Sequence, residues 1–168
     1  MRLLLELFII FVIVSTCFFV YQNYWDDLKY ILFSVEPSYV VYVGDVALEV
    51  TVADEQSERI SGLSGTVSLD DYEGKLFIYE TSGQHGIWMR DMLIPIDIFW
   101  FNDDLELVHY EKNITPNTYP EVFSPNKPAR FVLEMNANFI DSLRIELGDR
   151  LVLPSTLLPT DIREKLQK

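Results

Sequence analysis

The side chains best suited to chemistry gather in a segment that runs from a tryptophan to an aspartate. Trp88, Arg90 and Asp91 precede a proline-containing turn, and Asp97 follows it. Alternate residues of a strand share a face, so Trp88 and Arg90 are expected to point the same way, with Met89 opposite. An arginine can bind a carboxylate through two hydrogen bonds, and an indole can stack on a sugar or a flat apolar ligand. The segment predicts a binding cleft or, as the favoured alternative, a core in which the tryptophan and methionine pack and the aspartate orients a turn.

A second candidate is Glu134, which lies between two apolar residues in a predicted core strand. Burying a carboxylate without a partner is costly, so we expect a nearby cation. The candidate partners are Arg59, Arg90 and Arg130. A buried ion pair that fixes strand register is the favoured interpretation. The alternative is a general base or a metal ligand with a raised pKa.

The two histidines, His85 and His109, give only a weak indication of a metal site. They could combine with Asp97, Glu111 or Glu134, but no His-x-His, His-x-x-His or His-Glu-x-x-His spacing is present. No Gly-x-Ser-x-Gly elbow exists, and the single cysteine, Cys17, lies in the apolar front of the chain. We therefore predict no metal, no cofactor and no nucleophilic catalysis.

The charge balance excludes one class of partner. Lys and Arg total 13 against 26 Asp and Glu, which gives a net charge of −13. Such an acidic chain is repelled by phosphate backbones and has no basic patch, so nucleic-acid binding is not expected.

Residues 3–20 predict a single membrane-spanning helix, because Glu6 is the only charge among them. Tyr21, Tyr24 and Trp25 follow where an interfacial aromatic belt is expected, and the helix is predicted to continue as a stalk that ends before Pro37. Arg2 before the span places the N-terminus in the cytoplasm and the domain outside it. The alternatives are a cleaved signal peptide and a lipoprotein modified at Cys17.

The rest of the chain predicts short strands separated by turns. The expected strands are 38–43, 46–53, 75–79, 86–90, 94–101, 105–114, 130–135 and 150–153, with a short helix within 54–63 and a helical turn at 139–143. Four prolines between 115 and 128 predict a long surface loop without regular strand or helix. These elements predict a mainly β single domain that is a sandwich or is barrel-like and has one or two short helices. The domain is expected to follow the N-terminal transmembrane helix. The expected divisions are 1–36 for the anchor, 37–154 for the domain and 155–168 for a tail.

Several short segments follow one another in a recognisable order between residues 50 and 153. They are Val52-Ala53, Glu58-Arg59, Gly62-Leu63-Ser64-Gly65, Glu73-Gly74-Lys75-Leu76-Phe77, Ile87-Trp88-Met89-Arg90-Asp91-Met92, Ile94-Pro95-Ile96-Asp97-Ile98, Arg130-Phe131-Val132-Leu133-Glu134-Met135 and Gly148-Asp149. With these segments, residues 50–153 resemble the DUF192 family. The resemblance implies a compact β fold, often behind a signal or anchor segment, and implies no activity. Arg90, Asp91 and Met92 stand where the family pattern has Lys, Asn and Thr.

The sequence favours a membrane-anchored binding or accessory module for a small ligand, a glycan or a partner protein. The candidate ligand-binding residues are His85, Trp88, Arg90, Asp91, Asp97, Arg130 and Glu134. One alternative is an envelope acid/base hydrolase that uses Asp97 or Glu134 with His85 or Arg90. Another is a scaffold that docks on a membrane protein through the predicted helix at residues 25–35.

Overall fold

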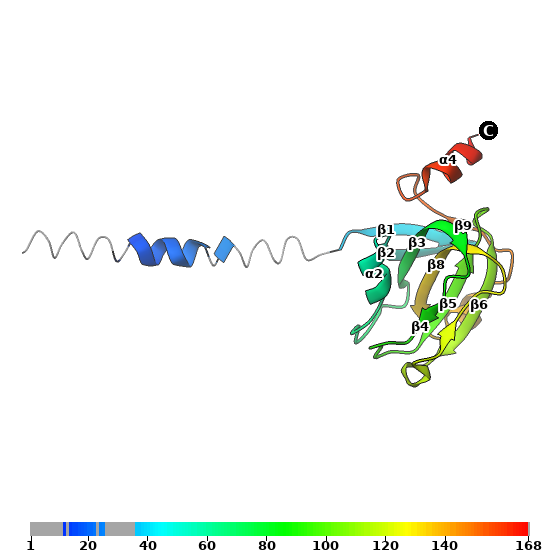
Figure 1. Cartoon of the computed structure of the whole chain (residues 1–168), viewed down its shortest axis with the longest axis horizontal. Coiled ribbons are helices and arrows are strands. Elements are labelled where there is room, and N and C mark those ends of the chain that lie inside the picture. The colour runs from blue at the N-terminus through cyan, green and yellow to red at the C-terminus, as the bar shows by residue number, and fades with distance from the viewer. Residues whose placement is uncertain (1–11, 13, 23, 26–35, 168) are drawn as a thin grey trace, which may run out of the picture. The chain divides into compact units, whose positions relative to one another are not determined.

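A computed structural model describes residues 12, 14–22, 24, 25 and 36–167 of the chain (Figure 1). The chain divides into two compact units, Met1–Glu36 and Pro37–Lys168. The described residues of the first unit are helical up to Trp25. Most of the predicted span at 3–20, and the stalk and docking helix beyond Trp25, lie outside the described residues. Within the part that is described, no helix is both long and apolar enough to cross a membrane.

The second unit is built on one seven-stranded sheet and a two-stranded ribbon. The sheet has the order β6-β5-β8-β3-β2-β1-β9, and the ribbon pairs β4 with β7. The strands are β1 (Ser38–Val43), β2 (Val46–Ala53), β3 (Glu73–Gly83), β4 (Ile87–Trp88), β5 (Ile96–Phe101), β6 (Leu107–Ile114), β7 (Val122–Phe123), β8 (Ala129–Asn136) and β9 (Leu151–Val152). Strands β2 and β3 are parallel, whereas the other paired neighbours are antiparallel.

Short helices connect and cover the strands. They are α2 (Gln56–Ser61), the 3-10 turn η1 (Pro116–Thr118), α3 (Phe139–Leu143) and α4 (Thr160–Leu166). Helix α2 lies in the crossover between the parallel strands β2 and β3, where a longer connection is required. A capping box at Glu55 and Glu58 begins this helix, and Gly62 with a φ of 51° ends it. The predicted helix within 54–63 and the helical turn at 139–143 are both confirmed.

The two edges of the large sheet meet at one end, so the sheet is curled. The backbone N–H of Leu107 donates to the Asp149 carbonyl at 2.8 Å, and that of Leu151 donates to the Leu105 carbonyl at 2.8 Å. A bridge between Glu106 and Arg150 lies between these two bonds. The predicted mainly β domain with short helices is confirmed, with one curled sheet as its main feature.

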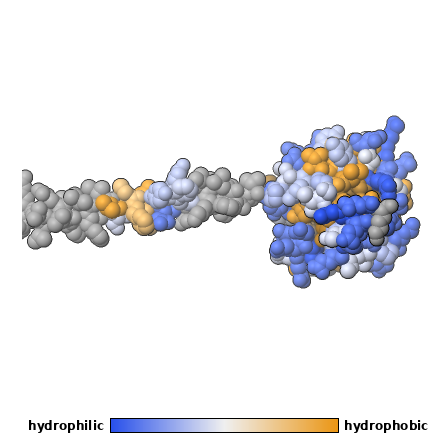
Figure 2. Space-filling view, turned by 90° about the horizontal axis from the view of Figure 1, so that it is seen from above, coloured by the Kyte–Doolittle hydropathy of each residue, from blue (hydrophilic) through white to orange (hydrophobic). Residues whose placement is uncertain are grey.

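Apolar residues pack on both faces of this sheet because side chains alternate along each strand. The first apolar cluster includes Leu76, Phe99, Phe131 and Leu133, together with Ile162 from α4. The second apolar cluster takes the intervening strand positions and is covered by the ribbon. Its buried members are Ala53, Leu63, Phe77, Ile87, Met89, Met92, Ile96, Ile98, Trp100, Ile114, Ala129 and Val132. In Figure 2, the face seen from above is largely hydrophilic, with a smaller area of hydrophobic residues.

The structure corrects two expectations about local structure. The proline-rich segment 115–128 is not free of regular structure, because it contains η1 and β7. Its prolines flank the two residues of β7, which leaves their backbone groups available for pairing with β4. Strict alternation along the predicted strand 105–114 would place Leu107 and Tyr110 on opposite faces, but a register shift opposite Trp100 and Phe101 places them on the same side.

Candidate functional site

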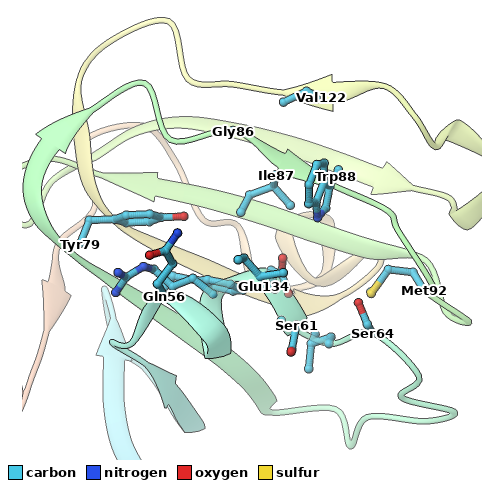
Figure 3. Close-up of a pocket in the computed structure, with 15 residues that line it drawn as sticks. Gln56, Ser61, Ser64, Tyr79, Gly86, Ile87, Trp88, Met92, Val122 and Glu134 are labelled. Atoms are coloured by element: carbon cyan, nitrogen blue, oxygen red, sulfur yellow. The ribbon is translucent and has the colours of Figure 1, made fainter.

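A cavity of about 400 Å³ lies on the side of the second apolar cluster (Figure 3). It is lined by residues of α2 and the loop after it, of β3 and β8 in the sheet, and of the β4–β7 ribbon. This volume falls in the range of small-molecule sites in proteins. The crossover and the ribbon therefore create a space of ligand size above the centre of the sheet.

The walls of the cavity are mainly apolar and aromatic. Phe77 and Tyr79 come from β3, Trp88 from β4, and Met92 from the turn after the ribbon strand. Trp88 is 41% exposed, so its indole lies at the edge of the cavity and not in the core. A ligand that entered would cover this indole, which is the type of amphipathic anchor that dominates binding energies.

Glu134 supplies a buried carboxyl group to this apolar space. The residue is only 4% exposed, and its Oε2 atom has no hydrogen-bond partner within the described residues. Burial raises the pKa of Glu134 to about 8, against the opposing effects of the positive charge on Lys75 and a backbone hydrogen bond from Leu63. Lys75 is the register partner of Glu134 across β3 and β8. At neutral pH the carboxyl group is therefore largely protonated.

Two serines beside Glu134 present oxygen atoms to the same cavity. The Ser64 hydroxyl donates to the backbone carbonyl of Arg90 at 2.8 Å. The Ser61 hydroxyl donates to the Ser57 carbonyl at 3.1 Å. Each hydroxyl has one hydrogen, so both oxygens are left with lone pairs that can accept further bonds.

The Tyr79 end of the cavity is held by stacked side chains. The rings of Tyr79 and His85 lie 3.5 Å apart and nearly parallel, and the Arg59 guanidinium lies 5.2 Å from the Tyr79 ring centroid. Arg59 also donates to the carbonyls of Asp54 and Ile78, the latter at 3.0 Å. Burial raises the pKa of Tyr79 to about 12, so its hydroxyl group stays protonated at physiological pH. His85 thus supports the wall without lining the cavity itself.

The structure confirms the predicted alternation around Trp88. Met89 is buried in the second apolar cluster, whereas the Arg90 guanidinium lies 4.9 Å from the Trp88 ring centroid. The Arg90 Nε atom is 3.7 Å from the carboxylate of Asp91, which is exposed. Arg90 and Asp91 therefore lie beside the indole, outside the lining of the cavity.

Asp97 belongs to the opposite face of the sheet. It is fully buried, and its carboxylate accepts the backbone N–H groups of Asn113 at 2.7 Å, Asn138 at 3.2 Å and Ile140 at 3.0 Å. These bonds tie the end of β6 and the start of α3 to β5. The turn-orienting role predicted for Asp97 is confirmed, and the structure does not bring this residue to the cavity.

Arg130 also lies elsewhere, because it binds the C-terminal helix. Its guanidinium donates to both carboxylate oxygens of Asp161, and its Nε donates to the Tyr79 carbonyl at 3.1 Å. The arginine partner predicted for Glu134 is wrong. Arg130 pairs with Asp161 and Asp103, and Arg90 pairs with Asp91. The Arg59 guanidinium donates to two backbone carbonyls.

The histidines are engaged separately. His85 Nε2 is 2.8 Å from the Thr81 carbonyl, and His109 Nε2 is 3.2 Å from Glu111 Oε1. Among the described residues, no three His, Cys, Asp or Glu side chains are grouped so that they could hold a metal ion.

Of the seven candidate residues, Trp88 and Glu134 line the cavity. Sequence reasoning missed Phe77, Tyr79, Met92 and the two serines as cavity residues. The pairing of β7 with β4 brings the proline-rich segment to the cavity through Val122. The segment Gly62-Leu63-Ser64-Gly65 was a sequence signal for this part of the cavity. It follows the helix that connects two parallel strands, and loops in such positions often carry binding residues.

The fold and site define a class of small mainly β domains with a ligand-sized cavity on a curled sheet. The family model of DUF192, described as "Uncharacterized ACR", matches residues 39–153. The chain belongs to the DUF192 family.

Comparison with known proteins agrees with this assignment. The chain is 31% identical over 67 residues to a UPF0127 protein of Pyrococcus furiosus, a match that covers 40% of this chain and 52% of the relative. The chain thus spans about half the length of the curated relative that it matches.

Two solved structures have a similar fold. A protein of unknown function from Novosphingobium aromaticivorans superimposes with a TM-score of 0.64 at 27% identity, covering 68% of this chain and 84% of the other. A protein of Sinorhizobium meliloti, described as a candidate transcription regulator, has a TM-score of 0.64 at 24% identity and covers 68% and 91%. The latter likeness shows the fold alone.

Proposed function

We propose that this protein is a membrane-anchored module outside the cytoplasm that binds a small, mainly apolar molecule in the cavity above Glu134. The observation that carries the proposal is the combination of aromatic walls with a buried carboxyl oxygen that has no partner within the described residues. A few polar groups in an otherwise apolar pocket are typical of small-molecule sites, where they fix the orientation of the ligand. The anchor is inferred from the apolar residues 3–20 alone.

The energetic cost of Glu134 supports a binding role. A buried carboxyl group with a strongly raised pKa destabilises the folded protein once it ionises. A purely structural position would be better served by an apolar side chain of similar size. Groups with such pKa values gather at functional sites.

The geometry gives less support to the hydrolase. An acid/base pair needs two groups within reach of one substrate atom. Asp97 is on the other face of the sheet with its oxygens occupied by three backbone N–H groups, and His85 is stacked behind Tyr79. Arg90, the other partner proposed, lies over the Trp88 ring beside Asp91 and outside the lining of the cavity. Neither His85 nor Arg90 is therefore placed to act with Glu134, which favours binding over hydrolysis.

A thermal-shift panel tests the binding proposal. The full chain in detergent micelles would be melted with flat apolar molecules, amphiphiles and short glycans. A binder raises the melting temperature in proportion to the logarithm of its concentration over Kd. We expect at least one apolar class to do so, and the Trp88→Ala variant to lose most of the shift. Tyr42→Ala is the matched control, because Tyr42 has a similar exposure of 43% but lies on β1 away from the cavity. If the ligand raised the melting temperature of both variants equally, Trp88 would not contribute to binding and the cavity would not be the site.

The anchor needs its own experiment. Protease added to sealed cells or spheroplasts should degrade the domain while a cytoplasmic marker survives, and alkaline washing should leave the chain in the membrane fraction. Release of the full-length chain by the wash, or protection of its domain from protease, would contradict the anchor or its orientation.

A further inference from the structure

We infer that the ligand carries an amine, and that Glu134 receives the ammonium group while the aromatic walls receive an apolar body. This inference rests on the proposed function of the same cavity. It goes further because it states the chemical class of the ligand and which atom of the protein recognises it.

The first argument is the imbalance of hydrogen-bonding groups near Glu134. Its Oε2 atom accepts no bond within the described residues. The hydroxyl hydrogens of Ser61 and Ser64 are already donated to backbone carbonyls, so these oxygens face the cavity as acceptors. Figure 3 shows Glu134 between the two serines on one side and Trp88 on the other. A ligand with several N–H donors complements these three oxygens, whereas a ligand with only acceptors does not.

Aromatic rings provide the second argument. Phe77, Tyr79 and Trp88 line the space, and the electron-rich faces of such rings attract cations. Two of these rings already hold a guanidinium at 4.9 and 5.2 Å from their centroids. An ammonium bound between a carboxylate and aromatic faces would use the same attraction in a space largely removed from water.

The two arginines beside the cavity leave the Glu134 Oε2 atom without a hydrogen bond. The Arg59 guanidinium donates to two backbone carbonyls and lies over Tyr79, and that of Arg90 lies over Trp88 beside Asp91. Lys75 lowers the pKa of Glu134, but the effect of burial is larger. The remaining donors of the lining, on Gln56, Tyr79 and Trp88, make no bond to the Oε2 atom among the described contacts.

Binding of an ammonium would be linked to proton release. Free Glu134 is mainly neutral below pH 8, whereas an ammonium ligand stabilises the carboxylate. Because the proton must leave before the ammonium binds, the affinity falls about tenfold for each pH unit below that value. We therefore expect amine affinity to fall about tenfold to a hundredfold from pH 8 to pH 6, and the affinity of an uncharged analogue to stay nearly constant.

Matched pairs of probes test the inference by calorimetry on the full chain in detergent micelles. The pairs are 2-phenylethylamine with 2-phenylethanol and tryptamine with tryptophol, which differ only in the amine and the hydroxyl group. At pH 8, wild type should bind at least one amine tenfold or more tightly than its alcohol. Glu134→Gln should reduce this preference to about twofold and abolish the pH dependence. Glu106→Gln, which removes an exposed carboxylate outside the cavity, is the control and should behave as wild type. Partition into micelles is the same for all three proteins and cancels in the comparison.

Equal affinity for amine and alcohol, an unchanged preference in Glu134→Gln, or no binding of either pair would overturn the amine inference. None of these results overturns the proposed function, because the thermal-shift panel with uncharged ligands tests binding in the cavity separately. Circular dichroism of Glu134→Gln confirms that a lost preference is not lost folding.

Discussion

Asp161 in α4 binds the buried guanidinium of Arg130 in β8 with both of its carboxylate oxygens. Arg130 Nη1 donates to Oδ2 at 2.5 Å, and Nη2 donates to Oδ1 at 3.0 Å. The arginine also donates to Asp103 and to the Tyr79 carbonyl. A bidentate pair of this kind fixes position as well as charge, so the C-terminal helix is attached to the strand that carries Glu134.

Asp161→Asn is expected to lower the melting temperature, because the amide cannot offer two acceptors to the guanidinium. The hydrogen bond from Arg130 holds the pKa of Asp161 below its usual value of 3.8, so the stability that it contributes is present above that value and is lost as the pH falls through the lower folded value. Melting curves from pH 7 to pH 2 check both effects. Glu164→Gln on the same helix is the control, and equal curves for the two variants would show that the pair does not stabilise the domain.

Glu134→Gln should change stability with the opposite dependence on pH. In wild type the folded state holds the proton between the unfolded pKa of about 4.5 and the folded value of about 8, so stability falls as the pH rises through this interval. The full effect is on the order of 5 kcal/mol. Denaturant unfolding at pH 5 and pH 8 should show the loss in wild type and little of it in the glutamine variant. A wild type that gains stability between these values would refute a protonated Glu134.

Asp97→Ala should destabilise the domain without a selective effect on ligand binding. The substitution leaves three backbone N–H groups without their acceptor, at about 1–3 kcal/mol for each one that remains buried. Asp97→Asn should be milder, since its oxygen can still accept from Asn113 and Asn138 while its NH₂ group faces the Ile140 N–H. Urea unfolding at pH 7 ranks the variants, and a loss of ligand affinity in a still-folded Asp97→Asn protein would place Asp97 in the site after all.

Gly86→Ala should disturb the ribbon that covers the cavity. A Cβ atom at this position would lie 2.5 Å from Val122 Cγ1 and 3.0 Å from Ser124 Oγ, so β7 would have to move away from β4. Overpacking of this kind costs about 1–3 kcal/mol. Val122→Ala removes the closest atom, and the double variant Gly86→Ala with Val122→Ala should regain most of the lost stability. Additive effects in this double-mutant cycle would show that the two residues are not in contact.

The strands could be predicted because their signals are local. Val-rich and Tyr-rich runs such as Ser38–Val43 and Val46–Ala53 fold as expected, and the turn between them carries a glycine with a φ of 58°. Pairings between distant segments leave no such local mark. The proximity of Val122 to Trp88 depends on a pairing across more than thirty residues, and that of Leu63 to Glu134 depends on the crossover.

The candidate site could be predicted only in part for a related reason. A carboxylate between apolar strand residues looks the same in sequence whichever face it takes, yet Asp97 meets backbone N–H groups and Glu134 meets a cavity. Arg130, one of the three arginines predicted as partners of Glu134, pairs instead with Asp161, a residue of the predicted tail. Partner choice among many charged groups is decided by tertiary structure.

The closure of the curled sheet has a consequence for synthesis of the chain. Strand β1 needs β9 as its outer neighbour, and the pair Val43 and Leu151 is separated by most of the domain. Pairings of such long range form late, because a large loop must close first. During translation, the outer edge of β1 stays without its partner until β9 has left the ribosome. A nascent chain of this protein therefore exposes the outer edge of β1 at Tyr42 and Val43 to other chains until Leu151 and Val152 have been made.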